Sequence, residues 1–168
     1  SARKLAVSSN NINYLIHCSL PDHSNGYATR SHSVLTSLNT LGIDITGITR
    51  PGYPWDVRFS SPPSDDPHHV IDNVNYHHLS GPVQRELTIS EYIDHASRVI
   101  ESNTINNGAK YIHACSNYLN AFPALFTARR LGIPFIYEVR GFWEITESSR
   151  KLGWENSDKY QVDKQLET

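Results

Sequence analysis

Residues 12–42 constrain the fold of this chain more than any other stretch. Residues 12–18 (INYLIHC) form an apolar run of strand length, and a polar turn with one glycine, Gly26, follows them. The next residues place apolar side chains at the spacing of one helical face, at Val34, Leu35, Leu38 and Leu41. Gly42 stands where a helix C-terminal cap is expected. A strand, a glycine turn and a helix in this order predict the opening unit of a doubly wound α/β sheet.

Strand and helix patterns continue to alternate along the chain. Short strands are predicted around residues 43–49, 74–79, 111–115 and 133–139. Thr88 and Glu91 have the spacing of a capping box, which predicts that a helix follows. A later helix is predicted with Pro123 in its first turn and Gly132 as its cap, and the last one near residues 158–167. This alternation predicts a Rossmann-like, doubly wound parallel sheet of at least five strands with helices on both faces.

The composition limits the classes of function. A chain of 168 residues suits one domain with a real core, and a net charge of −2 gives no reason to expect nucleic acid as a partner. No apolar run reaches the roughly 18 residues that a membrane-spanning helix needs. Cys18 and Cys115 both end apolar runs, which favours buried reduced thiols in a cytoplasmic protein. The chain contains no methionine, and this predicts that it is a piece of a longer polypeptide.

Polar loops follow the predicted strands, and a parallel sheet gathers such loops at one edge. They span residues 19–26, 50–56, 115–120 and 140–144. Amide groups at the start of the first helix favour a bound anion, whereas the alternative is that Gly26 only relieves strain in a turn. Aromatic side chains in or beside these loops suit either sugar recognition or an interface with another domain. These side chains are Tyr27, Tyr53, Trp55, Tyr118, Phe142 and Trp143.

Five motifs occur in a fixed order between residue 12 and about residue 144. They are NGYATR at 25–30, TRPGYP at 49–54, YIHACSN at 111–117, the helix at 121–132 and PFIYEVRG at 134–141. With these motifs the chain resembles the N-terminal domain of a family 4 glycosyltransferase, the retaining class with the GT-B fold. The resemblance implies that residues 1–168 are a single acceptor-side, Rossmann-like domain. It also implies a second, C-terminal domain outside this sequence, which would bind the nucleotide sugar.

The same resemblance implies a function for the whole enzyme. It would move a sugar from a nucleotide-sugar donor to a glycan or lipid-linked acceptor, as in polysaccharide biosynthesis, in the cytoplasm or at the inner face of the membrane. No metal or other cofactor would be required, because helix ends and basic side chains support the departing diphosphate. The isolated chain would be inactive. Two alternatives stay open: a non-catalytic carbohydrate- or partner-binding module, and a flavodoxin-like cofactor-binding domain, which the order of the motifs disfavours.

The resemblance carries over to individual residues unevenly. Gly26 matches a first-loop glycine that approaches the donor phosphates. Contacts to the acceptor are implied for Tyr27, His113, Asn117, Tyr118, Arg140 and Trp143. A second histidine of the family pattern is replaced by Cys115, and Arg140 stands where many members have an active-site histidine. No catalytic residue is therefore assigned.

Structural roles are the alternatives for several of these residues. Arg140 could pair with Glu144, and His113 could be a satisfied histidine at a strand end. Glu138 lies within an apolar strand, so its burial would require a partner such as Arg140.

Two further features concern metal binding and assembly. The adjacent histidines at 68–69 and 77–78 lack the spacing of metal ligands, so they are predicted to be solvated and no metal is expected. A last strand and helix of the domain are expected to be missing, which would leave one surface incompletely covered. Trp154, Tyr160 and Leu166 are therefore predicted to pack back on the domain or against a second copy in a homo-oligomer.

Overall fold

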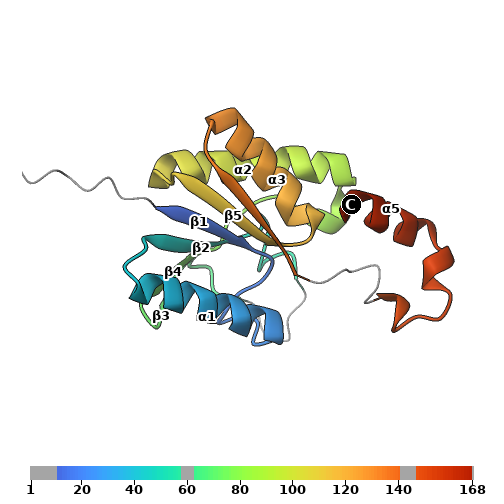
Figure 1. The fold of residues 1–168 in the computed structure, drawn as a ribbon, viewed down its shortest axis with the longest axis horizontal. Helices are drawn as coiled ribbons and strands as arrows, with labels where there is room; N and C mark the ends of the chain where they lie inside the picture. The colour runs from blue at the N-terminus through green and yellow to red at the C-terminus, as the bar shows by residue number, and fades with distance from the viewer. Residues whose placement is uncertain (1–10, 58–62, 141–146, 168) are drawn as a thin grey trace, which may run out of the picture.

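The computed structural model, which describes residues 11–57, 63–140 and 147–167, contains one six-stranded sheet (Figure 1). The strands are β1 (Ile12–Ile16), β2 (Ile45–Thr49), β3 (His68–Ile71), β4 (Val74–His77), β5 (Tyr111–Ser116) and β6 (Phe135–Val139). They lie in the order β3-β4-β2-β1-β5-β6, and all neighbours are parallel except β3 and β4. The predicted parallel sheet of at least five strands is confirmed.

Helices cover both faces of this sheet. The helices are α1 (Gly26–Thr40), α2 (Ile89–Asn107), α3 (Tyr118–Leu131) and α5 (Asp158–Glu167), with 3₁₀ turns η1 (Gln84–Glu86) and η2 (Trp154–Asn156). Figure 1 shows α1 below the sheet and the pair α2 and α3 above it, with α5 in the tail at the right. Both the two-faced arrangement and the tail helix agree with the sequence prediction.

Successive side chains of the central strand β1 pack into two core clusters on opposite faces of the sheet. Tyr14 and Ile16 pack on the side of α1 with Leu35, whereas Leu15 packs on the opposite side with Ile100 of α2. All five side chains are fully buried. A strand buried on both faces belongs at the centre of a parallel sheet, because successive side chains point to opposite faces. The loop after β1 therefore starts in the middle of the carboxyl edge.

The helix caps follow the sequence signals. Thr88 and Glu91 form the predicted capping box at the start of α2. Gly108 and Gly132 end α2 and α3 in the left-handed conformation, and Gly42, with a φ of 78°, directly follows the last turn of α1. These positions suit glycine because a Cβ disfavours positive φ.

The start of α3 differs from the prediction. The helix begins at Tyr118, so Pro123 lies inside the helix and not in its first turn. Asn120 explains the earlier start, because its side-chain amide donates to the carbonyl of Cys115 at 2.9 Å and its backbone amide donates to Asn117 at 3.0 Å. These two bonds turn the chain into a helix directly after β5.

The hairpin of β3 and β4 is an addition to the predicted strands. Asp72 and Asn73 form its two-residue turn with φ values of 49° and 62°, as a type I′ turn requires. The hairpin stacks His68 on His77 and brings His69 to 4.8 Å from the His78 ring centroid.

The histidine at the end of β4 was expected in solvent, and this prediction was wrong. His78 is fully buried, and its Nε2 lies 3.0 Å from the hydroxyl of Ser19. The reason is that β4 pairs with β2 inside the sheet, so the residue after β4 enters the interior beneath the loop after β1.

The loop after β2 is held in the interior by an ion pair. The guanidinium of Arg50 donates to both carboxylate oxygens of Asp56, at 2.5 and 2.9 Å, and both side chains are buried. Tyr53 is 1% exposed, so it is not available to a sugar as the sequence had led us to expect. Trp55 is 37% exposed and remains accessible.

Gly52 in this loop has a φ of 95°, and a Cβ there would lie 2.5 Å from the carbonyl oxygen of Pro82. We expect Gly52→Ala to lower the free energy of unfolding by about 2 kcal/mol or more, since both backbone strain and a clash oppose it. The matched control is Gly26→Ala, because Gly26 has no positive φ and its Cβ would meet nothing within 4 Å. Denaturant unfolding of both variants tests this. Equal stabilities would contradict it.

The β6 side of the sheet is less covered than the centre. α1 contacts β2 and β4, and among the described residues no helix lies over β6 on that face. Ile136, which faces that side, is 50% exposed. β6 is therefore less covered than the central strands among the described residues, and the absence of a last strand and helix stays a prediction.

The tail packs back on α3 at one point. The hydroxyl of Tyr118 donates to the carboxylate of Asp163 at 3.0 Å, and Asp163 is 5% exposed. Trp154, Tyr160 and Leu166 are partly buried. Packing against a second copy stays a prediction. None of the described helices has the length and apolar character needed to cross a membrane.

Candidate functional site

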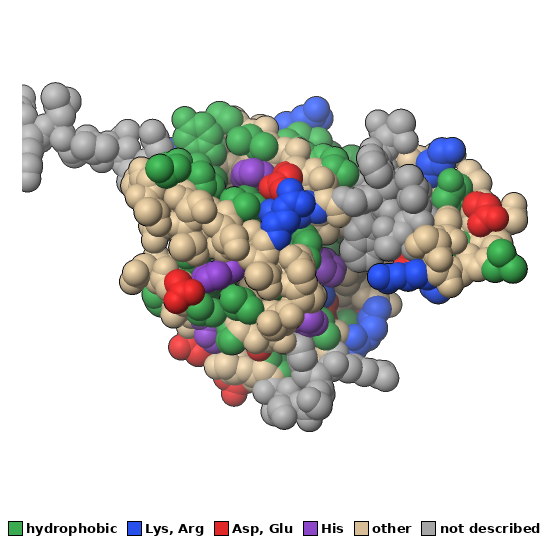
Figure 2. Space-filling view, turned by 60° about the horizontal axis from the view of Figure 1, so that its bottom comes forward, with side chains coloured by type: hydrophobic (Ala, Val, Ile, Leu, Met, Phe, Trp, Pro, Cys, Tyr) green, Lys and Arg blue, Asp and Glu red, His purple; other side chains and the backbone are tan. Residues whose placement is uncertain are grey.

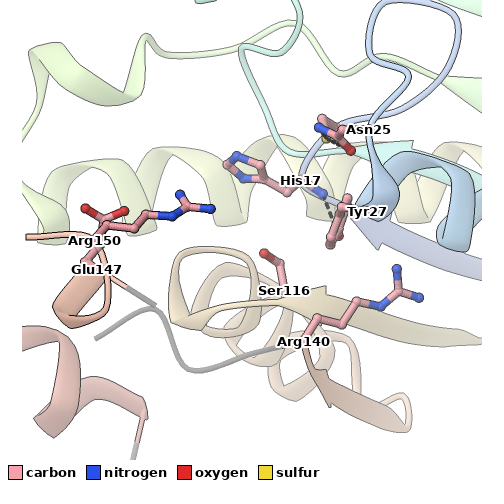
Figure 3. Close-up of a pocket in the computed structure, with 8 residues that line it drawn as sticks. His17, Asn25, Tyr27, Ser116, Arg140, Glu147 and Arg150 are labelled. Carbon is pink, nitrogen blue, oxygen red and sulfur yellow. Dashed lines mark hydrogen bonds between the residues drawn. The ribbon is translucent and has the colours of Figure 1, made fainter. Parts of the chain in front are cut away.

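A cavity of about 380 Å³ lies at the carboxyl edge of the sheet (Figure 3). It is lined by His17, Cys18, Asn25, Tyr27, Ser116, Arg140, Glu147 and Arg150. These residues follow β1, end β5, follow β6 or belong to the tail. β1 pairs with β2 on one side and β5 on the other, so the chain changes its direction of sheet growth here. Ligands of doubly wound folds bind at such a switch point.

The N-terminus of α1 borders the cavity. Asn25 caps the helix, because its side-chain oxygen accepts a hydrogen bond from the amide of Ala28 at 2.9 Å. Gly26 is the first helical residue, is exposed and lacks a positive φ, so the backbone does not need a glycine there. The open space around Gly26 leaves room for a close approach by a ligand.

Tyr27 connects the ends of β1 and β5. Its hydroxyl accepts a hydrogen bond from the backbone amide of His17 at 3.0 Å and donates to the carbonyl of Cys115 at 3.2 Å. The guanidinium carbon of Arg140 lies 5.1 Å from the ring centroid. Burial, reinforced by Cys115, raises the pKa of Tyr27 far above its ordinary value, so the hydroxyl stays protonated. Tyr27 therefore lines the cavity and links the ends of β1 and β5, and its hydroxyl is already hydrogen-bonded to the backbone of both.

Arg140 lines the cavity, but its guanidinium turns away from Arg150 in Figure 3. Its Nε donates to Glu138 at 2.9 Å, its Nη1 to Ser31 at 2.6 Å and its Nη2 to the hydroxyl of Tyr14 at 2.5 Å. The side chain is 3% exposed. Arg140 is thus a paired arginine, as the structural alternative predicted, and its partner is Glu138. The predicted partner Glu144 lies outside the described residues.

Glu138 joins four elements on the face of the sheet where α1 lies. Besides Arg140, its carboxylate accepts from Tyr14 at 3.1 Å and from Arg30 at 3.2 Å, and His113 Nε2 lies at 3.3 Å. Burial alone would raise the pKa of Glu138, but the hydrogen bond and charge of Arg140 outweigh it and lower the pKa. Figure 2 shows basic, acidic and histidine side chains side by side on this face. The predicted requirement of a partner for Glu138 is met.

The remaining sequence-predicted residues either do not line the cavity or lie outside the described residues. His113 contacts the ring of Tyr14, with centroids 4.7 Å apart, and does not line the cavity. Asn117 and Tyr118, at the start of α3, are 3% and 4% exposed and do not line it either. Trp143 lies outside the described residues.

From the sequence, no role was assigned to Ser116, Arg150 or His17. Ser116 ends β5 with a φ of 111° and is 2% exposed. Its position directly after the predicted apolar strand at 111–115 is the sequence signal that could have pointed to a role at the sheet edge. Arg150 lies in a polar tail, where no sequence signal sets it apart. His17 is the residue directly after β1, and burial, followed by the charge of Arg50, lowers its pKa to about 4.

Tyr27→Phe should lower the free energy of unfolding by about 1–3 kcal/mol, because the His17 amide and the Cys115 carbonyl lose their partner. Tyr111→Phe is the control, since no hydrogen bond of the Tyr111 hydroxyl is found in the described part of the chain. It should change stability by less than about 0.5 kcal/mol. Urea unfolding monitored by circular dichroism measures both. A Tyr27 variant as stable as the control would contradict the bridging role.

Acid should destabilise the fold between pH 6.5 and 4. Burial lowers the pKa of both His17 and His78 to about 4, and charges of neighbouring groups add to this. The unfolded chain then binds more protons than the folded one below pH 6.5, so the free energy of unfolding falls as the pH falls. Burial lowers the pKa values of His77 and His113 as well, so His78→Gln should reduce this slope without abolishing it. Unfolding curves at pH 7, 6 and 5 test this, and equal slopes would contradict it.

Comparisons with known proteins address the fold. No protein-family model matches the sequence, and no curated protein matches it either. The fold is similar to that of a sucrose-phosphate synthase from Thermosynechococcus elongatus, with a TM-score of 0.65 at 12% sequence identity. The match covers 94% of this chain and 40% of that protein, so the chain spans less than half of it.

Proposed function

We propose that this chain is the acceptor-binding half of a retaining glycosyltransferase. The observation that carries the proposal is the composition of the cavity. Three of the five motifs that resemble family 4 glycosyltransferases contribute to its lining: the first through Asn25 and Tyr27, the third through Ser116 and the last through Arg140. Stretches far apart in the sequence thus meet at one cavity at the switch point of the sheet.

The similar fold supports glycosyl transfer at a general level. Sucrose-phosphate synthase is a glycosyltransferase with the GT-B fold, and this chain matches 40% of it. In our proposal, residues 1–168 are one Rossmann-like domain and a second, C-terminal domain binds the nucleotide sugar. The cavity then opens toward the second domain, and the isolated chain does not transfer sugar.

The chemistry depends on stabilising the diphosphate that leaves the donor sugar. The N-terminus of α1 carries a partial positive charge, and the absence of a side chain at Gly26 lets the phosphates approach it. Helix ends and basic side chains supply this stabilisation in our proposal, so no metal is required. Transfer proceeds with retention of configuration at the sugar, as in family 4.

The acceptor, a glycan or a lipid-linked sugar, occupies the cavity. Tyr27 and Arg140 shape its wall, while their polar groups fasten α1 to the strand ends. His113, Asn117, Tyr118 and Trp143 stay predicted acceptor contacts. A lipid-linked acceptor would place the enzyme in the cytoplasm at the inner face of the membrane.

The test is Gly26→Trp in the longer polypeptide. The indole should block the donor phosphates and lower transfer by about 100-fold or more, because displacing reacting groups by even 1 Å has effects of this size. The fold should survive, since a side chain at Gly26 meets open space. Transfer is measured as release of nucleoside diphosphate, and a melting curve is recorded for each variant.

Gly26→Ala is the matched control and should keep most of the activity, because a methyl group leaves room for the phosphates. Undiminished transfer by a stable Gly26→Trp variant would remove Gly26 from the site. Release of nucleoside diphosphate by the 168-residue chain alone would show that it is not merely the acceptor half. Carbohydrate binding without any transfer by the longer polypeptide would favour the non-catalytic module.

A further inference from the structure

We propose that Asn25 is a site of spontaneous deamidation, and that the carboxylate formed there closes the N-terminus of α1 to the donor phosphates. Asn25 caps α1 and lines the cavity, so a charge at this residue acts directly at the site. The modification itself is inferred from the geometry around Asn25. Only its effect on the phosphates rests on the proposed function.

The reaction joins the side chain of Asn25 to the backbone of the residue that follows it. The backbone nitrogen of Gly26 passes its proton to solvent and forms a bond with Cγ of Asn25, while the bond from Cγ to Nδ2 breaks and ammonia leaves. Water then opens the resulting cyclic imide at either of its C–N bonds. The products are aspartate or an isoaspartyl linkage at position 25. The reaction consumes water and releases ammonia, and it needs no oxidant, reductant or enzyme.

The attacking nitrogen of Gly26 is accessible. Gly26 is the first residue of α1, and its amide makes no hydrogen bond with any described residue. This is expected, because the first amides of a helix have no acceptor within it. A Cβ at Gly26 would meet nothing within 4 Å, and both Asn25 and Gly26 are exposed. The amide can therefore approach the side chain, and water can reach the imide.

The attacked carbonyl of Asn25 is activated by the helix. Its Oδ1 accepts a hydrogen bond from the amide of Ala28 at 2.9 Å. Negative charge develops on this oxygen when Cγ is attacked, and an amide at a helix N-terminus stabilises such a charge. Among the described residues, the departing Nδ2 contacts only Sγ of Cys18, at 3.7 Å. The capping bond thus assists the reaction, and the leaving group is weakly held.

A second Asn-Gly pair, Asn107 and Gly108 at the end of α2, lacks these conditions. The amide of Gly108 donates to the carbonyl of Ile105 at 3.3 Å. Nδ2 of Asn107 donates to Asn13 at 2.7 Å, and Oδ1 accepts from the amide of Ala109 at 3.1 Å. The nitrogen that would attack and the group that would leave are both engaged, so this pair must open before it reacts. The chain therefore contains an internal reference for the same dipeptide.

Deamidation changes the charge of the site more than its fold. Aspartate is as good an N-cap as asparagine, so α1 stays in place when Asn25 is converted. The carboxylate adds a negative charge where the donor phosphates approach α1 in our proposal, and like charges repel. An isoaspartyl linkage lengthens the backbone by a methylene group, which draws the cap away from Ala28. Both products therefore oppose phosphate binding.

The first experiment follows both pairs in the 168-residue chain by peptide mass spectrometry during incubation in neutral buffer. Asn25 should be modified at least about 10-fold faster than Asn107, because opening the end of α2 adds to the barrier. In urea both pairs should react at similar rates, since only the folded chain distinguishes them. Gly26→Ala should slow the reaction at Asn25 by about 10-fold, because a Cβ hinders the approach of the amide. Hydroxylamine, which cleaves the chain at imides, should cut between residues 25 and 26.

Two outcomes of this experiment contradict the modification site. Equal rates for the two pairs in the folded chain, or modification of Asn25 in urea alone, would overturn the site. Conversion of Asn25 without any cleavage by hydroxylamine would overturn the route through an imide.

The second experiment measures the effect on transfer by the longer polypeptide. Asn25→Asp reproduces one product and should lower transfer at limiting nucleotide sugar by about 5-fold or more, because two like charges a few ångströms apart repel by this factor even in water. Its melting temperature should stay close to that of the unmodified protein. The matched control is Asn73→Asp, which adds the same charge at the exposed turn between β3 and β4, outside the cavity lining, and should not change transfer.

The outcomes separate this inference from the proposed function. Undiminished transfer by Asn25→Asp would overturn the effect on the phosphates, and so would an equal loss in Asn73→Asp. Deamidation of Asn25 in a longer polypeptide that transfers no sugar would refute the proposed function and leave the modification site standing.

Discussion

The parallel pairing of β1 on both of its edges is the constraint on which the site depends. Leu15 pairs with Ile48 of β2 and with Ala114 of β5, so β1 is central and buried. The helix after β1 crosses one face, and the helix after β5 crosses the other. The N-terminus of α1 therefore borders the cavity, at the switch point of the sheet.

Polar contacts then hold α1 against the strand ends. The hydroxyl of Tyr27 spans β1 and β5, and Arg140 ties β6 to Ser31 of α1. Glu138 neutralises Arg140, so the cation can remain nearly inaccessible to solvent without an unpaired charge. The cavity wall is thus fixed by hydrogen bonds of defined direction, whereas the middle of α1 is held by apolar packing around Leu35.

The alternation of strands and helices and the capping glycines could be predicted from the sequence, because they depend on local patterns. The meeting of the strand ends at one edge followed from the parallel sheet that this alternation predicts. The burial of His78 and Tyr53 could not be predicted from the sequence, because it depends on contacts with the distant loop around Ser19. Tyr118 is covered because Asp163 returns to it from the tail. The conformation of Ser116 was equally hidden, since residue type does not indicate a positive φ for serine.

The position of β6 bears on the tendency of the chain to pair with strands of other molecules. It is the edge strand of the described sheet, and Ile136 on its surface is half exposed. Exposed apolar edges invite pairing with strands of other molecules, and a charge within the edge discourages this. Glu138 is that charge, and Pro134 before the strand withholds an amide donor. The β6 edge thus joins an exposed apolar side chain to a carboxylate and a proline, which are residue types that disfavour intermolecular β-sheet growth.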